Sequence, residues 1–159
     1  MVRNRGFRVR EVSDRELDDI LTVRVMVEVP AMRLLAELED RPEFTQARAQ
    51  CDRLQAAALA GDIARFLAED RDLHVGLTAL LSNEALTEVV GNLRDRTRLY
   101  GLRLMDLATL EATAAEHFDL VAALEAGDAE RAGSLMTAHL RHIRSDWSAT
   151  PEAVRTPRV

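Results

Sequence analysis

The sequence predicts an all-α protein, an antiparallel bundle of six or seven helices preceded by a short N-terminal extended segment. Aromatic residues make up only 4% of the chain, whereas alanine and leucine are abundant, and this composition favours closely packed helices over a β-sandwich. Apolar residues recur at spacings of three and four along most of the sequence, and glycine–aspartate pairs interrupt this pattern twice. The short connections between these helices favour antiparallel neighbours.

The length, charge and cysteine content restrict the class of protein. A chain of 159 residues suits one domain with a sizeable core, and 47% apolar with 30% charged residues is typical of a globular protein. The net charge of −6 argues against nucleic-acid binding by this chain alone. Cys51 is the single cysteine, which excludes an internal disulfide, and no apolar run reaches the length that spans a bilayer. We therefore expect a cytoplasmic protein.

The helices can be placed from their start and stop signals. Residues 1–12 alternate apolar and polar side chains around "GFRVREV", which is typical of an extended segment, and Ser13 with Glu16 forms a capping box. Pro30 predicts a kink or a break near Val29, and Pro42 suits the first turn of a helix. The pattern predicts seven helices, over about 14–21, 22–39, 42–59, 63–81, 84–105, 107–125 and 129–147.

Asp70 and His74 are polar residues that the helical pattern directs toward the core. They stand four residues apart in "FLAEDRDLHVGL" and share a helix face close to the apolar stripe containing Leu73 and Leu77. Burying an unpaired carboxylate costs several kcal/mol unless a cation or strong donors meet it. The role of the pair therefore depends on whether the rest of the chain brings further ligands to it.

Two more histidines, His117 and His139, fall on the apolar faces of two other expected helices. Three imidazoles and one carboxylate that converge in a bundle core form a ligand set suited to zinc, nickel, manganese or iron. Alternatively, each histidine is a hydrogen-bonded core residue, and the residue pattern leaves both interpretations open. His142 competes for the third position, but it lies among charged residues near a helix end, where a cationic histidine is stabilised by the helix dipole. We therefore prefer His139.

Several short segments occur in a specific order. They are "VRVMVEVPAMRLLAE" with Arg24, Glu28 and Ala36; "AEDRDLH" with Asp70 and His74; "SNEAL" with Asn83 and Leu86; "AAEHFDLVAALEAGDAERA" with His117; and "MTAHL" with His139. In this order they resemble the C-terminal effector-binding and dimerisation domain of GntR-type transcription regulators, the FadR C-terminal (FCD) class. The resemblance covers about residues 13–142, and Leu73 departs from it where the family usually has phenylalanine.

The resemblance implies a metal and a ligand. In the FCD family an aspartate and three histidines hold a divalent metal inside a helical cavity, where small organic acids or sugar acids bind. It therefore implies a divalent cation, zinc as the first choice and nickel, manganese or iron as alternatives, on Asp70, His74, His117 and His139. A carboxylate effector also needs cationic or polar partners, for which the candidates are Arg24, Asn83, Arg94 and Arg98.

The resemblance also implies a domain organisation. Residues 1–12 look like the last strand of a winged-helix wing or a linker, residues 13–148 like the helical effector-binding and dimerisation domain, and residues 149–159 like a disordered tail. Regulators of this family carry a winged helix-turn-helix before the sensor domain, and no recognition helix precedes residue 13. We therefore expect a homodimer that contacts DNA only through a separate winged-helix domain and does not contact a membrane.

The leading hypothesis is thus a metal-dependent sensor of a small carboxylate. One alternative is a metal-dependent helical-bundle enzyme that activates water or a thiol, and another is a metal-free interaction module. We expect no catalysis, because the sequence offers no obvious general base. Glu116 directly precedes His117, so its side chain should point about 100° away from that of His117 around the helix.

Overall fold

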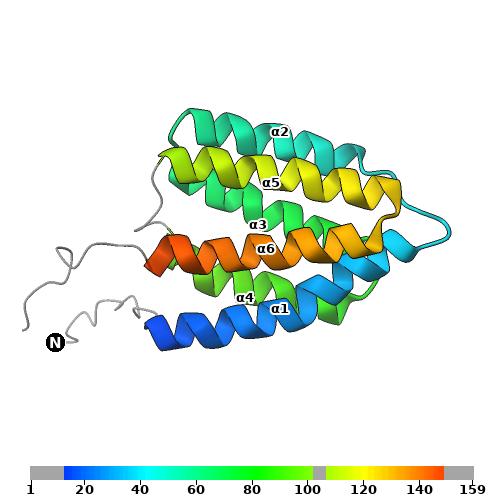
Figure 1. Cartoon of the computed structure of the whole chain (residues 1–159), viewed down its shortest axis with the longest axis horizontal. Helices are drawn as coiled ribbons and strands as arrows, with labels where there is room; N and C mark the ends of the chain where they lie inside the picture. Colours follow the sequence, from blue (N-terminus) through cyan, green and yellow to red (C-terminus); the bar gives the residue numbers. More distant parts are fainter. Residues whose placement is uncertain (1–12, 102–106, 149–159) are drawn as a thin grey trace, which may run out of the picture.

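Six helices make up the described part of the chain (Figure 1), which in this computed structural model comprises residues 13–101 and 107–148. The helices are α1 (Asp14–Glu37), α2 (Thr45–Leu59), α3 (Ile63–Ala79), α4 (Glu84–Gly101), α5 (Leu107–Ala126) and α6 (Ala129–Ser148). The predicted all-α bundle of six or seven helices is therefore confirmed.

The packing of the helices creates a shared centre. Helix α1 packs on α6 and α4, α3 packs on α4, and α5 packs on α6, so these five helices follow one another in the order α3, α4, α1, α6 and α5. Helix α2 packs on α3 and α5 and closes the bundle on that side (Figure 1). Five helices can therefore direct side chains to one buried point, while α2 contributes apolar cover.

Helix α1 is one continuous helix, and the predicted division near residue 21 is wrong. The Thr22 hydroxyl donates to the Asp18 carbonyl at 2.8 Å inside the helix, so Thr22 does not act as a cap. The buried face continues across this point from Leu17 and Leu21 to Arg24. Since no stop signal separates the two halves and both bury the same face, the chain remains helical.

Pro30 does not end α1 either. Its ring lies on the exposed side of the helix, and Ala31, Met32 and Leu35 directly after it are buried in the core. Burial of the following turn offsets the hydrogen bond that proline cannot donate. The expected break near Val29 is therefore not found.

The predicted glycine stops and aspartate caps are confirmed at two turns. Gly61 and Gly127 adopt φ angles of 65° and 71°, the left-handed region that glycine enters without strain. Asp62 then accepts the backbone N–H of Arg65, and Asp128 accepts that of Arg131. The two turns fix where α3 and α6 begin, and so where their histidines face.

Other predicted boundaries shift or fall outside the described residues. Helix α2 begins at Thr45 rather than at Pro42, because Phe44 inserts its ring into the core at 5% exposure and occupies the N-cap position. The expected extended segment 1–12, the helix end near 105 and the tail 149–159 lie outside the described residues.

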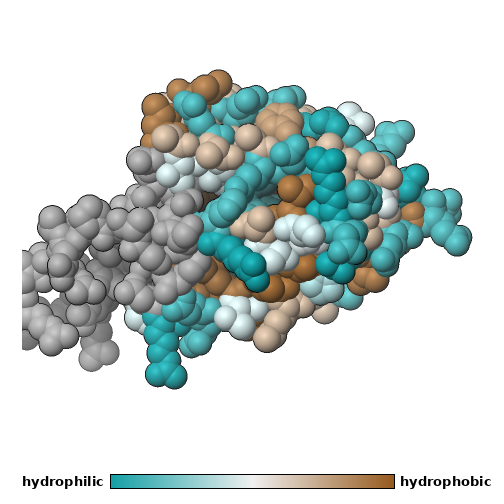
Figure 2. Space-filling view, in the orientation of Figure 1, coloured by the Kyte–Doolittle hydropathy of each residue, from teal (hydrophilic) through white to brown (hydrophobic). Residues whose placement is uncertain are grey.

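The surface is polar over most of the face seen in Figure 2, with apolar residues at its upper left, near one end of α2, and in its lower part, where α1 runs. Exposed apolar residues of α1 occur at spacings of three and four: Val23, Met26, Pro30 and Leu34, which we call the α1 stripe. Within the described residues, no helix combines the length and the apolar character needed to cross a membrane.

Candidate metal centre

Helix α3 supplies the first two members of the site. Asp70 and His74 lie one turn apart on its inward face, and Asp70 Oδ1 lies 3.7 Å from His74 Nε2. The His74 side chain is 1% exposed, whereas the Asp70 side chain keeps 16% of its surface accessible. The Thr78 hydroxyl donates to the His74 carbonyl and belongs to the same buried face.

Helix α5 brings His117 against this pair. Its Nδ1 lies 2.7 Å from the Thr113 carbonyl oxygen, which can only accept, so Nδ1 carries the hydrogen. Its Nε2 lies 3.0 Å from Asp70 Oδ1 and 3.1 Å from His74 Nε2. In neutral His117, a lone pair on Nε2 would therefore face a carboxylate oxygen. A cation or a proton between the two atoms would remove that repulsion.

Helix α6 brings the third imidazole, His139. Its ring stacks on that of His74 with the centroids 5.2 Å apart, and it meets the ring of His117 edge-on at 4.6 Å. His139 Nε2 is buried without a hydrogen-bond partner and lies 3.9 Å from Asp70 Oδ1. Its Nδ1 donates to Glu116 Oε2 at 2.8 Å. Thus a second imidazole nitrogen faces the same centre with a free lone pair.

The four side chains form what we call the His–Asp cluster. Each offers one ligand atom, and these atoms lie within 4.8 Å of one another. The shortest separations, 3.0 to 3.9 Å, are close to the roughly 3.3 Å between ligand atoms around a tetrahedral ion with bonds near 2 Å. The cluster consists of Asp70, His74, His117 and His139. The donor set and its orphaned nitrogen therefore fit a divalent transition metal.

Arg94 ties the cluster to two neighbouring helices. From α4, its Nη1 donates to Asp70 Oδ2 at 2.8 Å, while Nε and Nη2 both donate to Glu28 Oε2 of α1. Glu28 also accepts from Arg24 Nε at 2.6 Å, and Arg24 Nη1 lies 3.5 Å from the Thr97 hydroxyl. The arginines and Glu28 are at most 2% exposed. One buried polar network thus joins α1, α3 and α4.

The charges around the cluster keep its ligands in the forms that bind metals. Burial alone would raise the pKa of Asp70, but the charge of Arg94 holds that pKa well below its usual value. Burial, reinforced by Arg94, holds the pKa of His74 well below its usual value, and burial also lowers the pKa of His139. The carboxylate is therefore ionised and these two imidazoles are neutral.

The candidate effector residues occupy different environments. Arg94 contacts Asp70 of the cluster directly, whereas the buried Arg24 is linked to the cluster through Glu28, and Arg24 Nη2 is buried without a hydrogen-bond partner. Arg98 is partly buried in the last turn of α4, and Asn83 is exposed and caps α4 by accepting the N–H of Leu86. Within the described residues, neither Asn83 nor Arg98 makes a hydrogen bond or ion pair to the cluster.

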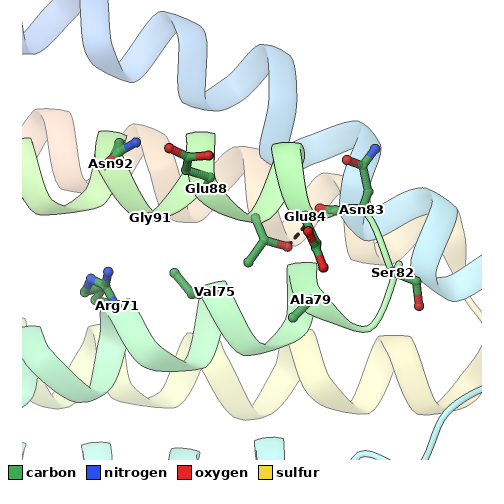
Figure 3. Close-up of a pocket in the computed structure, with 10 residues that line it drawn as sticks. Arg71, Val75, Ala79, Ser82, Asn83, Glu84, Glu88, Gly91 and Asn92 are labelled. Carbon is green, nitrogen blue, oxygen red and sulfur yellow. Dashed lines mark hydrogen bonds between the residues drawn. The ribbon is translucent and has the colours of Figure 1, made fainter.

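A groove of about 620 Å³ lies outside the cluster, between α3 and α4. Figure 3 shows Val75 and Ala79 of α3 opposite Glu88 and Gly91 of α4, with Asn83 at the connection between the helices. None of its lining residues belongs to the His–Asp cluster. The groove is therefore separate from the candidate metal centre.

Comparison with known proteins assigns the chain to a family. The FCD domain model matches residues 19–142, and the chain therefore belongs to the FCD domain family, the helical effector-binding domain of GntR-type regulators. The solved structure of E. coli McbR/YncC superposes with a TM-score of 0.77 at 22% identity, covering 89% of this chain and 72% of that one. A structure described as a GntR transcriptional regulator from Rhodococcus sp. RHA1 gives 0.80 at 19%, covering 93% and 72%. No curated protein matches by sequence at a significant level.

Two acidic residues beside the site were not predicted to belong to it. The sequence pattern assigns Glu28 no contact with the site, and it predicts that Glu116 points about 100° away from His117. The structure places Glu116 about a quarter exposed between α5 and α6, where it contacts His139 and His142. The position of His142 three residues after His139 was the available sequence signal, because both can face the same neighbouring side chain.

Proposed function

We propose that this domain senses a small carboxylate through a divalent metal held by Asp70, His74, His117 and His139. The observation that supports it most is the direction of the nitrogens. His117 and His139 both use Nδ1 for outer hydrogen bonds, to Thr113 and Glu116, and so turn Nε2 toward Asp70. A metal would satisfy these lone pairs and the carboxylate together. Zinc is the first choice for this ligand set, with nickel, manganese and iron as alternatives.

A bound cation would neutralise Asp70 and leave coordination positions open to a carboxylate oxygen. The residues of the chain hold and orient these groups, and Arg94 fixes the second oxygen of Asp70. We propose no catalytic residue, because family membership makes the domain regulatory. Turnover of a bound carboxylate by the metal-loaded protein would contradict this view.

The buried Arg24 is the better candidate for contact with the effector carboxylate. All the donors that Arg94 directs into the network already meet Glu28 or Asp70, whereas Arg24 keeps Nη2 unpartnered although it is buried. An unpaired guanidinium donor in a buried site is costly and would be satisfied by a carboxylate oxygen. The other predicted effector residues are Arg94, Arg98 and Asn83. To contact an effector, Arg94 would have to give up a hydrogen bond to Glu28 or Asp70.

Metal analysis and calorimetry test the proposal. Purified protein should hold about one metal ion per chain. Its melting temperature should fall on chelation and recover on addition of zinc. His117→Ala should remain helical but lose affinity for zinc. Absence of metal uptake by the wild-type protein, with zinc, nickel, manganese or iron, would refute the metal centre.

The effector contact is tested on the zinc-loaded protein with a panel of small hydroxy- and dicarboxylic acids. Arg24→Met should weaken binding of the acid that the wild type prefers by about tenfold or more, since a charge-assisted hydrogen bond contributes roughly 1.5–3 kcal/mol. Arg96→Met is the matched control, because Arg96 is 53% exposed and pairs with Glu16. Equal affinity in both variants would remove Arg24 from the site.

We also propose that the domain forms a homodimer in the cytoplasm through the α1 stripe, and that a separate winged-helix domain contacts DNA. The stripe repeats at helical spacing over roughly 16 Å, and Met26 within it is 67% exposed. Met26→Glu should shift the mass in solution from dimer to monomer. Leu59→Glu, at a position 65% exposed on α2, is the control and should leave the mass unchanged. A dimer that survives Met26→Glu would place the interface elsewhere.

A further inference from the structure

Glu116 of α5 contacts two histidines of α6, His139 in the His–Asp cluster and His142 at the surface. It lies on α5 next to the ligand His117, yet its carboxylate crosses to α6. There Oε2 accepts from His139 Nδ1 at 2.8 Å and Oε1 accepts from His142 Nδ1. The His139 side chain is 4% exposed and that of His142 is 58% exposed. One carboxylate therefore connects a buried imidazole to an imidazole at the surface.

The bond to Glu116 decides which nitrogen of His139 carries the hydrogen. A carboxylate only accepts, so His139 must keep the hydrogen on Nδ1 and present Nε2 as a lone pair. The opposite tautomer would direct an N–H at the centre of the cluster, where it would compete with a cation. His117 is fixed in the same way by the Thr113 carbonyl, a backbone group that no side-chain substitution removes. The tautomer of His139 thus depends on a side chain, whereas that of His117 depends on a backbone carbonyl.

We infer that Glu116 is a positioning residue of the metal centre, which sets the tautomer and ring orientation of His139 and is itself held by His142. This inference rests on the proposed function, because it assigns Glu116 the role of an outer hydrogen-bond acceptor behind a metal ligand. Such acceptors fix ligand orientation and raise ligand basicity, and their loss weakens metal affinity without removing a ligand. The connection also places one support of the buried site at the protein surface.

The test compares four variants of the full chain. Glu116→Ala removes the acceptor, Glu116→Gln keeps an acceptor oxygen without the charge, His142→Ala removes the outer partner of Glu116, and Glu111→Ala changes an exposed glutamate of the same helix. Zinc affinity is measured by competition with a chelator of known affinity. The tautomer of His139 is read from nitrogen-15 shifts of the imidazoles in metal-free protein.

We expect Glu116→Ala to weaken zinc binding by roughly 10- to 100-fold and to shift His139 away from the Nδ1–H tautomer. Glu116→Gln should restore that tautomer and part of the affinity, which a merely structural contact between α5 and α6 would not require. His142→Ala should weaken binding by less than about tenfold, and Glu111→Ala should have no effect. Circular dichroism without metal verifies that each variant is helical.

The outcomes separate this inference from the proposed function. If wild-type protein binds zinc and Glu116→Ala binds it equally well with an unchanged His139 tautomer, the role of Glu116 is wrong and the metal centre stands. If wild-type protein binds no metal, the proposed function fails and this inference fails with it. If Glu116→Ala is unfolded, the pair Glu116→Gln and His142→Ala decides: unchanged affinity and tautomer in both would overturn the inference.

Discussion

Arg94 Nη1 lies 2.8 Å from Asp70 Oδ2. One oxygen of the Asp70 carboxylate therefore faces the histidines, while the buried Arg94 donates to the other oxygen. The same guanidinium donates to Glu28 on α1. The Asp70 carboxylate, the position of α4 and the position of α1 are therefore linked through one side chain. A change in the charge on Asp70 would act on the Arg94–Glu28 contact, and so on the helix that carries the α1 stripe.

Arg94→Met tests how much the network depends on this residue. It removes the cationic partner of Asp70 and one of the two cationic partners of Glu28, at a position that is 2% exposed, so we expect a loss of roughly 3–5 kcal/mol in unfolding free energy. Urea denaturation of metal-free protein measures it. Adding zinc should recover part of the loss, because the cation supplies positive charge to Asp70.

Arg96→Met is the control for Arg94→Met. Its ion pair with Glu16 is largely exposed, so the change should cost less than about 1 kcal/mol. Similar losses in the two variants would mean that burial of the Arg94 network does not determine its contribution.

Two glycines should respond in opposite directions to substitution by alanine. Gly127 adopts φ 71°, and a Cβ there would lie 2.1 Å from the Arg41 guanidinium and 3.5 Å from the Ala36 carbonyl oxygen. We expect Gly127→Ala to cost about 1 kcal/mol in unfolding free energy. Gly76 lies inside α3, and a Cβ added there would meet no atom of a neighbouring element within 4 Å, so Gly76→Ala should gain roughly 0.5–1 kcal/mol. Urea midpoints of the two variants on opposite sides of the wild type are the expected result, and a loss at Gly76 would contradict it.

The convergence of the His–Asp cluster could be predicted because its signals are local and inward. Asp70 and His74 share one helical face, and His117 and His139 each lie on an apolar stripe. The order of the short segments then pointed to the family. The same reasoning placed Arg94 near the site, but it could not assign its donors, because the choice between effector, Glu28 and Asp70 depends on the approach of three helices.

The parts that could not be predicted depend on contacts between helices. The continuity of α1 through Pro30 follows from the burial of side chains on both sides of the proline. The stop signals in a single sequence carry no information about that burial. Glu116 does leave the α5 face that carries His117, as its place in the sequence requires. Glu116 nevertheless contacts the cluster, because His139 of the neighbouring helix α6 donates to its carboxylate. Angular position on one helix therefore excludes Glu116 from the His–Asp cluster but not from contact with one of its members.

Cys51 gives a pH-dependent prediction that is independent of the metal centre. The thiol is buried in α2, and burial raises its pKa from 9.0 to about 11. Since the folded state holds the thiol proton more tightly than the unfolded state, this residue stabilises the fold fully below about pH 9. That contribution is lost as the pH rises toward 11, by up to about 2–3 kcal/mol.

The difference in unfolding free energy between wild type and Cys51→Ala isolates this effect from other groups that titrate at high pH. Wild-type protein should lose stability relative to the variant between pH 9 and 11, and its thiol should react slowly with iodoacetamide at pH 8 unless urea is present. A constant difference over that range, together with rapid alkylation of the native protein at pH 8, would show that Cys51 is accessible to solvent. The packing of α2 against α3 and α5 would then be looser than its fully buried Cys51 and Leu54 indicate.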